Sequence, residues 1–359
     1  MKLMERFVHG GNVYAERPPD GEWLDFSANI NPLGMADGVR REIIANVDGL
    51  VHYPDPDGRE IKQAIAEYYQ VPEKNLLLGN GAAELFYLYF NTLRHRNVLI
   101  PVPSFSEYER AAVAAGAEPV FHYLAASAGF LPDWEALLPK LAFMDCLIIG
   151  NPNNPTGCLV SRDEIEHCLR AAAKLGVMVL IDESFMDFRS DGDRYTVRGL
   201  LEQFDNLVIF HSLTKFYALP GLRLGFALAD AALVKRLEQG KDQWNMNLLA
   251  QKAGRAALLE ADYQEKTRCL IQTEGDYLTG ELATIGGLRV FKPSVNFILF
   301  NTRQRGVTAG ELTARAKKQG ILLRDCSNYP GLDDYYVRIA VRNHEENCLL
   351  VNCLKKLLG

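Results

Sequence analysis

The sequence predicts an α/β protein built around a mostly parallel β-sheet with helices on both faces, followed by a smaller α+β domain. Short runs rich in Leu, Ile and Val alternate with amphipathic segments as far as Trp244, and strands that are apolar on both faces and separated by helices are typical of a covered parallel sheet. Beyond Trp244 the pattern changes to long helical periodicity followed by short strands. The chain has 359 residues, of which 48% are hydrophobic, which is more than one core usually holds, so we expect two domains.

The elements of the first part alternate along the chain. The predicted helices carry apolar residues three and four positions apart, and they cover residues 59–69, 82–92, 106–115, 162–175 and 231–239. The predicted strands are the apolar runs between them, at residues 75–78, 98–101, 146–150, 177–182, 207–210 and 224–229. This order favours a sheet with helices on both of its faces.

The second part begins with helical periodicity. We expect residues 243–260 to form a helix that connects the two domains, followed by strands at residues 296–301, 321–324 and 336–341 and by a helix at the end of the chain. We therefore predict three segments. Residues 1–35 pack on the small domain, residues 36–243 form the large domain, and residues 244–359 form the connecting helix and the small domain.

Charge and hydropathy exclude several classes of partner. The formal net charge is −6 at pH 7 with an isoelectric point near 5.7, which argues against a nucleic-acid groove but allows a local pocket for one small anion. The N-terminus lacks the apolar core of a secretory signal. The longest apolar runs, such as residues 146–149 and 177–181, are strand-sized and far shorter than a membrane helix. We expect a cytoplasmic protein with no membrane contact.

The cysteines give no sign of a metal site or a disulfide framework. They stand at positions 146, 158, 168, 269, 326, 348 and 353. Their number is odd, and they form neither a CxxC motif nor paired metal-ligand spacing. We expect reduced thiols and no metal.

The most informative stretch is residues 212–225, which follow a predicted buried strand. It places Ser212, Thr214, Lys215 and Arg223 within twelve residues, beside glycines that allow close approach of the backbone. A lysine that is partly desolvated and close to positive charge attacks an aldehyde to form an imine, and the two hydroxyls and the guanidinium can neutralise a phosphate on the same molecule. The alternative is a solvated turn.

Three further motifs stand at the ends of predicted strands. Asp182 ends an apolar strand, where a carboxylate can keep a pyridinium nitrogen protonated, although a helix cap or a surface acid is the alternative. Asn154 lies in a proline-rich loop that can fix its amide toward a phenolate oxygen, or the loop is simply a turn. Residues 79–84 form a glycine turn that leads into a helix and can bind phosphate. Because this turn lacks the third glycine of a dinucleotide fingerprint, an NAD site is a weak alternative.

The order of these motifs resembles the fold-type I enzymes that depend on pyridoxal 5′-phosphate (PLP), the aspartate aminotransferase superfamily, over nearly the whole chain. The resemblance implies that the large domain binds PLP, that Lys215 forms the imine with it, that Asp182 pairs with the pyridine nitrogen and that Asn154 contacts the ring hydroxyl. It also implies a phosphate cup made by Ala82, Ala83, Ser212, Thr214 and Arg223.

Three aromatic or basic positions complete this resemblance. Phe105 matches the aromatic residue that stacks on the cofactor ring, and Arg338 matches the arginine that binds a substrate carboxylate. Phe185 stands where many members have a tyrosine that is bonded to the ring oxygen. Losing that donor should raise the basicity of the ring oxygen and leave more of the contact to Asn154.

Four segments, at residues 9–12, 25–34, 215–221 and 328–332, are similar to the threonine-phosphate decarboxylases of cobalamin biosynthesis. That similarity implies decarboxylation of L-threonine O-3-phosphate to (R)-1-amino-2-propanol O-2-phosphate. Histidinol-phosphate aminotransferases are similar over the same length and are the alternative, as is decarboxylation of serine phosphate. A regulator that binds PLP without turnover is disfavoured, because the assigned segments leave no residues for a DNA-binding domain.

A phosphorylated substrate needs several donors. Candidates are His9, Asn29, Tyr53, Arg324 and Arg338, because guanidinium groups contact phosphate or carboxylate through two bonds. The alternatives are a mobile terminal residue for His9 and a turn aromatic for Tyr53. The resemblance implies that Tyr53 reaches the neighbouring subunit of a homodimer with shared active sites. Arg342 lies on the same strand face as Arg338, where we favour a surface role.

Overall fold

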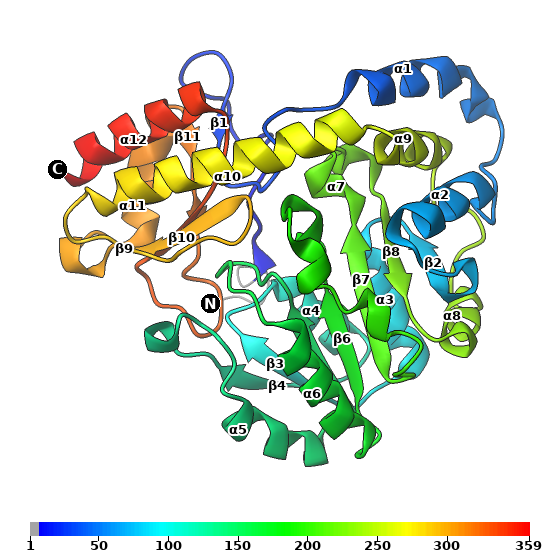
Figure 1. The fold of residues 1–359 in the computed structure, drawn as a ribbon. Helices are drawn as coiled ribbons and strands as arrows, with labels where there is room; N and C mark the ends of the chain where they lie inside the picture. The colour runs from blue at the N-terminus through cyan, green and yellow to red at the C-terminus, as the bar shows by residue number, and fades with distance from the viewer. Residues whose placement is uncertain (1–6) are drawn as a thin grey trace.

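The computed structural model describes residues 7–359, so the first six residues of the predicted N-terminal segment lie outside the described part (Figure 1). A seven-stranded sheet forms the centre of the large domain, in the order β2-β8-β7-β6-β5-β3-β4. Its strands are β2 (Leu76–Gly79), β3 (Asn97–Val102), β4 (Glu118–Tyr123), β5 (Cys146–Gly150), β6 (Met178–Asp182), β7 (Leu207–Ser212) and β8 (Gly225–Leu228). Strands β3 to β7 pair in parallel, and β8 is antiparallel to both of its neighbours.

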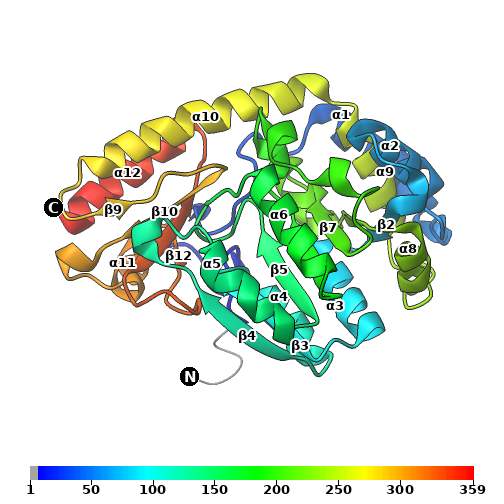
Figure 2. The same cartoon turned by 60° about the horizontal axis from the view of Figure 1, so that its bottom comes forward.

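Helices cover both faces of this sheet (Figures 1 and 2). They are α1 (Asp37–Asn46), α2 (Arg59–Tyr69), α3 (Ala82–Leu93), α4 (Ser106–Ala114), α5 (Trp134–Leu137), α6 (Arg162–Ala173), α7 (Leu213–Phe216), α8 (Ala231–Glu238) and α9 (Leu248–Leu258). Side chains alternate between the two faces of each strand. In β6, Val179 and Ile181 join the core that holds α2, α6 and α9, whereas Leu180 joins the core that holds α3, α4 and α8. The predicted architecture is confirmed.

The small domain is built on a four-stranded antiparallel sheet in the order β12-β13-β10-β9. Its elements are α10 (Ala261–Ala283), β9 (Arg289–Val290), β10 (Phe297–Asn301), α11 (Ala309–Lys317), β11 (Ile321–Leu322), β12 (Arg324–Asp325), β13 (Tyr336–Ala340) and α12 (His344–Leu358). Near the N-terminus, β1 (Leu24–Asp25) pairs in parallel with β11. This pairing holds the N-terminal segment on the small domain.

The sequence prediction did not include helices α1, α5, α7 and α11 or strands β1, β4 and β9, and three differences affect how the elements are arranged. The helix expected over residues 243–260 is α9, which packs against α1 and α2 on the large domain, and α10 makes the connection by running from there to α12 (Figure 1). Strand β4 was not expected, because it is an edge strand with exposed polar residues and pairs only with β3. The strand expected over residues 321–324 is divided between β11 and β12, which pair with different partners.

The described residues contain no helix that is both long enough and apolar enough to cross a membrane.

Candidate active site

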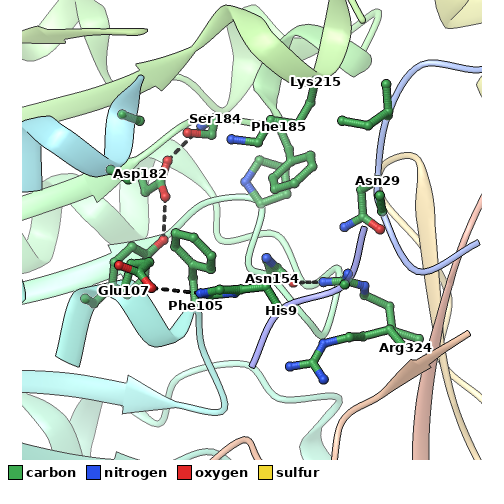
Figure 3. Close-up of a pocket in the computed structure, with 18 of the residues that line it drawn as sticks. His9, Asn29, Phe105, Glu107, Asn154, Asp182, Ser184, Phe185, Lys215 and Arg324 are labelled. Carbon is green, nitrogen blue, oxygen red and sulfur yellow. Dashed lines mark hydrogen bonds and ion pairs between the residues drawn. The ribbon is translucent and has the colours of Figure 1, made fainter. Parts of the chain in front are cut away.

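A cavity of about 470 Å³ lies where the parallel strands of the large sheet end beside the small domain (Figure 3). Eleven of the predicted site residues line it, namely His9, Asn29, Ala82, Ala83, Phe105, Asn154, Asp182, Lys215, Arg223, Arg324 and Arg338. Ends of parallel strands are the usual place for ligands in open α/β sheets. Three predicted residues, Ser212, Thr214 and Tyr53, do not line the cavity.

Lys215 lies in the short helix α7, which directly follows β7. Its Nζ donates a hydrogen bond to Ser212 Oγ at 3.0 Å and lies 5.7 Å from the ring centroid of Phe185. Burial lowers the pKa of Lys215 to about 8, the negative charge of Asp182 opposes this shift, and the guanidinium of Arg223 adds to it. At pH 7 roughly a tenth of the amine is therefore neutral, and hence nucleophilic, which is far more than for an ordinary lysine.

Asp182 stands at the end of β6 with both carboxylate oxygens held. Its Oδ2 accepts a hydrogen bond from the hydroxyl of Tyr108 at 2.6 Å, and its Oδ1 accepts one from the backbone N–H of Ser184 at 2.9 Å. Figure 3 shows the carboxylate facing the cavity. Sequence reasoning missed Tyr108, because a tyrosine within a predicted amphipathic helix is typical of a core residue. In the structure it is fully buried.

Helix α3 directs its first turn into the cavity beside Arg223. Gly81 precedes this helix with a φ of +84°, and a Cβ placed on it would lie 2.5 Å from Arg223 Nη2, so the guanidinium occupies the space that a side chain would need. Arg223 Nη1 also donates to the carbonyl of Pro220 at 3.0 Å. Free N–H groups of a helix start and a guanidinium together attract a phosphate group.

Ser212 and Thr214 lie behind Lys215. Their hydroxyls are buried and 2.7 Å apart, and Ser212 Oγ also accepts the bond from Lys215. In this structure, therefore, they position the lysine, and their predicted contact with a phosphate stays a prediction.

Asn154 and Arg338 meet across the two domains. Arg338 Nη1 donates to Asn154 Oδ1, and Arg338 Nη2 donates to the carbonyl of Ser27 at 2.9 Å. Because the oxygen of the Asn154 amide is engaged, its NH₂ group is the end left for a ligand. The Nε of Arg338 is buried and has no partner among the described residues.

The N-terminal segment closes one side of the cavity. His9 Nε2 lies 2.7 Å from Glu107 Oε1, and Arg324 Nη2 donates to the carbonyl of Val8 at 2.7 Å. Glu107 also accepts a hydrogen bond from the hydroxyl of Tyr87 at 3.0 Å. Although burial favours the neutral acid, the bonds from His9 and Tyr87 hold the pKa of Glu107 below its ordinary value. Sequence reasoning missed Glu107, because an acid is unexpected among so many donors for anions.

Aromatic rings and one amide complete the lining. Phe105 meets Tyr108 edge to face at 5.6 Å between ring centroids and His9 at the same distance. Asn29 is buried, and its Oδ1 has no partner among the described residues. In Figure 3, Asp182 and Arg324 lie on opposite sides of the site. The cavity thus has a carboxylate at one side and donors for anions at the other.

Two predicted residues lie elsewhere. Tyr53 follows the 3₁₀ helix η2 (Val47–Val51) and is 77% exposed, with its ring stacked on Trp244 at 4.4 Å between centroids. Arg342 donates to both carboxylate oxygens of Glu346 at 2.9 Å and to the carbonyl of Asp25 at 3.2 Å. These contacts hold Arg342 outside the cavity with its side chain only 22% exposed, and the surface role favoured from the sequence stays a prediction.

The residues present fit PLP. A nucleophilic amine (Lys215), a fixed carboxylate (Asp182) and a cationic corner (Arg223 with the start of α3) line one cavity. These are the groups that an aldehyde, a pyridine nitrogen and a phosphate each require. In the same cavity, the unpartnered buried Nε of Arg338 is a donor left for a second, anionic molecule, whereas the unpartnered Oδ1 of Asn29 is an acceptor left for an N–H or O–H group.

The fold and this site are those of the class I and II aminotransferases. The chain belongs to this family, whose model matches residues 21–353.

Two individual relatives carry the name of one activity within this family. Threonine-phosphate decarboxylase from Salmonella typhimurium is 36% identical over 360 residues, which cover 98% of this chain and 96% of that protein. A protein from Caldanaerobacter subterraneus, provisionally named as a threonine-phosphate decarboxylase, is 40% identical over 99% of this chain and 95% of its own length.

Solved structures show the same two groups of relatives. Histidinol-phosphate aminotransferase from Clostridium acetobutylicum is 32% identical with a TM-score of 0.87, and the match covers 93% of this chain and 98% of that one. L-threonine-O-3-phosphate decarboxylase from Porphyromonas gingivalis is 28% identical with a TM-score of 0.83, and the match covers 93% of this chain and 99% of that one.

Proposed function

We propose that this chain is a PLP-dependent decarboxylase that converts L-threonine O-3-phosphate to (R)-1-amino-2-propanol O-2-phosphate and carbon dioxide, a step of cobalamin biosynthesis. The relatives named as threonine-phosphate decarboxylases, at 40% and 36% identity, support the substrate. We also place the enzyme in the cytoplasm, since its substrate and cofactor are both phosphorylated metabolites and all seven of its cysteines are free thiols.

One observation of the structure carries this proposal. Arg324 and Arg338 lie directly opposite each other in the antiparallel pair β12–β13, and both line the cavity. Opposite residues in such a pair point to the same face, where two like charges repel. A substrate that carries both a carboxylate and a phosphate relieves this repulsion and uses both guanidinium groups. Threonine phosphate carries both anions, whereas histidinol phosphate carries only the phosphate.

The cofactor would be held by Lys215, by Asp182 at the ring nitrogen, by Asn154 at the ring oxygen and by Arg223 with the start of α3 at the phosphate. When bound, PLP accepts the electron pair of whichever bond of the substrate α-carbon stands perpendicular to its ring plane. The residues that orient the substrate therefore choose between loss of the carboxylate and loss of the α-proton.

The chain's own residues act on the substrate at both ends. Arg324, Arg338, His9 and Asn29 bind the two anionic groups and hold the substrate in one orientation. Lys215 Nζ delivers a proton to the α-carbon after carbon dioxide has left, and its pKa of about 8 suits a group that both gains and gives a proton near neutral pH. Asp182 keeps its orientation through Tyr108 and Ser184.

Product analysis tests this function. With L-threonine O-3-phosphate we expect carbon dioxide and the amino alcohol phosphate in equal amounts, with no need for a 2-oxo acid. Rapid conversion of histidinol phosphate that requires 2-oxoglutarate, with no carbon dioxide from threonine phosphate, would establish the aminotransferase alternative. Serine phosphate differs by one methyl group, which an apolar contact discriminates by only about 1–3 kcal/mol, so both phosphoamino acids should be compared.

We further propose a homodimer in which Tyr53 of one subunit completes the active site of the other. The exposure of Tyr53 and its absence from the cavity of its own chain support a role outside its own subunit. Exposed apolar side chains on α1 and η2, such as Ile44, Leu50 and Val51, support an interface on the same surface.

A further inference from the structure

A second group of reactive side chains lies on the small domain, where α10 and α12 run side by side (Figures 1 and 2). Cys348 and His344 are one turn apart on α12, and Glu274 and Tyr277 face them from α10. We call these four residues the Cys348 cluster. None of them lines the active-site cavity, so the proposed decarboxylation does not use them.

The histidine of the Cys348 cluster is aimed at the thiol. His344 Nε2 lies 3.5 Å from Cys348 Sγ, and His344 Nδ1 lies 3.1 Å from Glu274 Oε1. A carboxylate at Nδ1 selects the tautomer that carries a proton there, which leaves the lone pair of Nε2 facing the sulfur. The arrangement of nucleophile, base and orienting carboxylate is the one that activates cysteine and serine nucleophiles.

Glu274 is itself held in place. Its side chain is only 9% exposed, and its Oε2 accepts a hydrogen bond from Asn347 Nδ2 at 2.9 Å. The His344 side chain is 64% exposed, so water can solvate the ring once it gains a proton. The carboxylate is therefore fixed by the fold, and the imidazole that it orients is accessible to solvent and to a small reagent.

Tyr277, whose ring centroid lies 4.8 Å from that of His344, contributes a second polar contact to the sulfur. Its hydroxyl lies 3.2 Å from Cys348 Sγ, and this contact, together with partial burial and the charge of the thiolate, raises the pKa of Tyr277 to about 12. The phenol therefore stays protonated and can donate a hydrogen bond to a thiolate. Charged groups near these residues include Glu345, which is exposed one turn before Cys348 on α12, Glu281, whose charge raises the pKa of Tyr277, and Lys355, which pairs with Glu281 at 2.6 Å.

The other cysteines lack such surroundings. Cys146, Cys168 and Cys326 are buried, Cys158 and Cys353 are partly buried, and burial raises the pKa of all five thiols. Cys269 is exposed on α10, and no hydrogen bond among the described residues involves its thiol. Cys348 is thus distinguished by its neighbours and not by its exposure.

We propose that Cys348 is a site of covalent modification, a thiol that His344 activates toward hydroperoxides and small electrophiles. His344 Nε2 takes the proton of the thiol, and the thiolate attacks one oxygen of a hydroperoxide. The S–O bond forms as the O–O bond breaks, the sulfur is oxidised by two electrons to a sulfenic acid, and the leaving oxygen takes the proton from His344 to become water or an alcohol.

The first test compares two cysteines of the same protein. The holoenzyme is treated with limiting iodoacetamide near pH 7, and the alkylation rates of the peptides that contain Cys348 and Cys269 are followed by mass spectrometry. We expect Cys348 to react at least about tenfold faster than the more exposed Cys269, and we expect the two rates to converge near pH 10, where ordinary thiols ionise without help. Equal rates near pH 7 would overturn the proposal.

Variants separate activation from exposure. His344→Gln should bring the rate of Cys348 down to that of Cys269, and Glu274→Gln should lower it in part, whereas the rate of Cys269 stays unchanged in both variants. His344 is exposed, so its replacement should leave the fold intact, which circular dichroism can verify. A rate of Cys348 that does not respond to His344→Gln would contradict the role of the imidazole.

The second test uses the oxidant itself. Hydrogen peroxide is added in the presence of a dimedone probe, which traps sulfenic acids, and the adducts are mapped by mass spectrometry. We expect the adduct on Cys348 and not on Cys269, and its loss in His344→Gln. Adducts on both cysteines alike, or on neither, would refute the oxidation step. Neither test requires a substrate, so the outcome is independent of the proposed decarboxylation.

Discussion

Lys215 combines burial with two opposing charges. Burial and Arg223 lower the pKa of its amine to about 8, while Asp182 acts in the opposite direction. The amine must be neutral to attack the aldehyde of PLP. A group with this pKa is neutral in roughly a tenth of the molecules at pH 7 and in nine tenths at pH 9.

The rate of covalent PLP attachment to the apoenzyme should therefore rise steeply between pH 7 and 9 and level off above. Asp182→Asn removes the charge that favours the protonated amine, so its rate should reach the plateau at lower pH. The visible absorbance of the bound cofactor measures both rates. A rate that still climbs from pH 9 to 10.5, as for an ordinary lysine, would refute the lowered pKa.

Glu107 is a second residue whose effect can be measured. Its carboxylate lies 2.7 Å from His9 Nε2, and hydrogen bonds to charged groups contribute about 1.5–3 kcal/mol. We expect Glu107→Gln to raise KM for threonine phosphate about tenfold with little change in kcat, because His9 loses the carboxylate that fixes its orientation.

A double variant gives the control for Glu107. If Glu107 acts through His9, then Glu107→Gln should add nothing to the effect of His9→Asn on KM. Additive losses would instead show that Glu107 acts on its own, for example through Tyr87 or Arg110, both of which donate hydrogen bonds to its carboxylate.

Site residues at strand ends were predictable, whereas their supporting partners were not. Asp182, Asn154 and Lys215 each follow an apolar run in the sequence, so their position at one edge of the sheet follows from the topology of parallel strands. Tyr108 and Glu107 act on partners that lie 74 and 98 residues away in the chain. A single sequence contains no local signal for such pairs.

At the scale of elements, the start of α3 shows how the backbone shapes the phosphate corner. Gly81 has a φ of +84°, and a Cβ there would meet Arg223 Nη2 at 2.5 Å. Gly116 has nearly the same φ, +85°, with nothing within 4 Å of its missing side chain. Both glycines therefore have a positive φ that favours glycine, but only Gly81 lies against Arg223.

Gly81→Ala should weaken PLP binding to the apoenzyme about tenfold or more, because it displaces a guanidinium that makes charged hydrogen bonds to phosphate. Gly116→Ala should cost stability of about 1–2 kcal/mol from the left-handed backbone without changing the affinity. Cofactor titration and urea unfolding give the two quantities. Equal losses of affinity in both variants would contradict the role of Arg223.

Some helices and strands can be predicted from the hydrophobic pattern of the sequence, and others cannot. The helix predicted at residues 59–69 is α2 with the same bounds, because its apolar face is regular and a left-handed residue flanks each end, Gly58 before it and Gln70 after it. Strand β4 escaped prediction since its edge position leaves it half-exposed. The helix at residues 243–260 was placed near its true position, but its packing against α1 and α2 depends on distant contacts.

At the scale of the whole molecule, Tyr53 does not line the active-site cavity of its own subunit. This residue lies on the surface beside Trp244, next to the exposed apolar residues of α1 and η2. If two subunits bury this surface together, each active site takes Lys215 from one chain and Tyr53 from the other. Association would then be a condition for activity, and dilution below the dissociation constant of the dimer should abolish turnover.

Hybrid dimers test this shared site. A Lys215→Ala subunit still provides Tyr53, and a Tyr53→Ala subunit still provides Lys215, so a hybrid of the two contains one intact site and one that lacks both residues. Random exchange makes about half of the dimers hybrid, and mass action on equal amounts should restore roughly a quarter of wild-type activity. Trp244→Leu removes the ring stacked on Tyr53 but keeps Tyr53 and should stay active, which separates the role of Tyr53 from the ring stacking. If subunits exchange, as native mass spectrometry can verify, and no activity returns, then Tyr53 does not serve the neighbouring site.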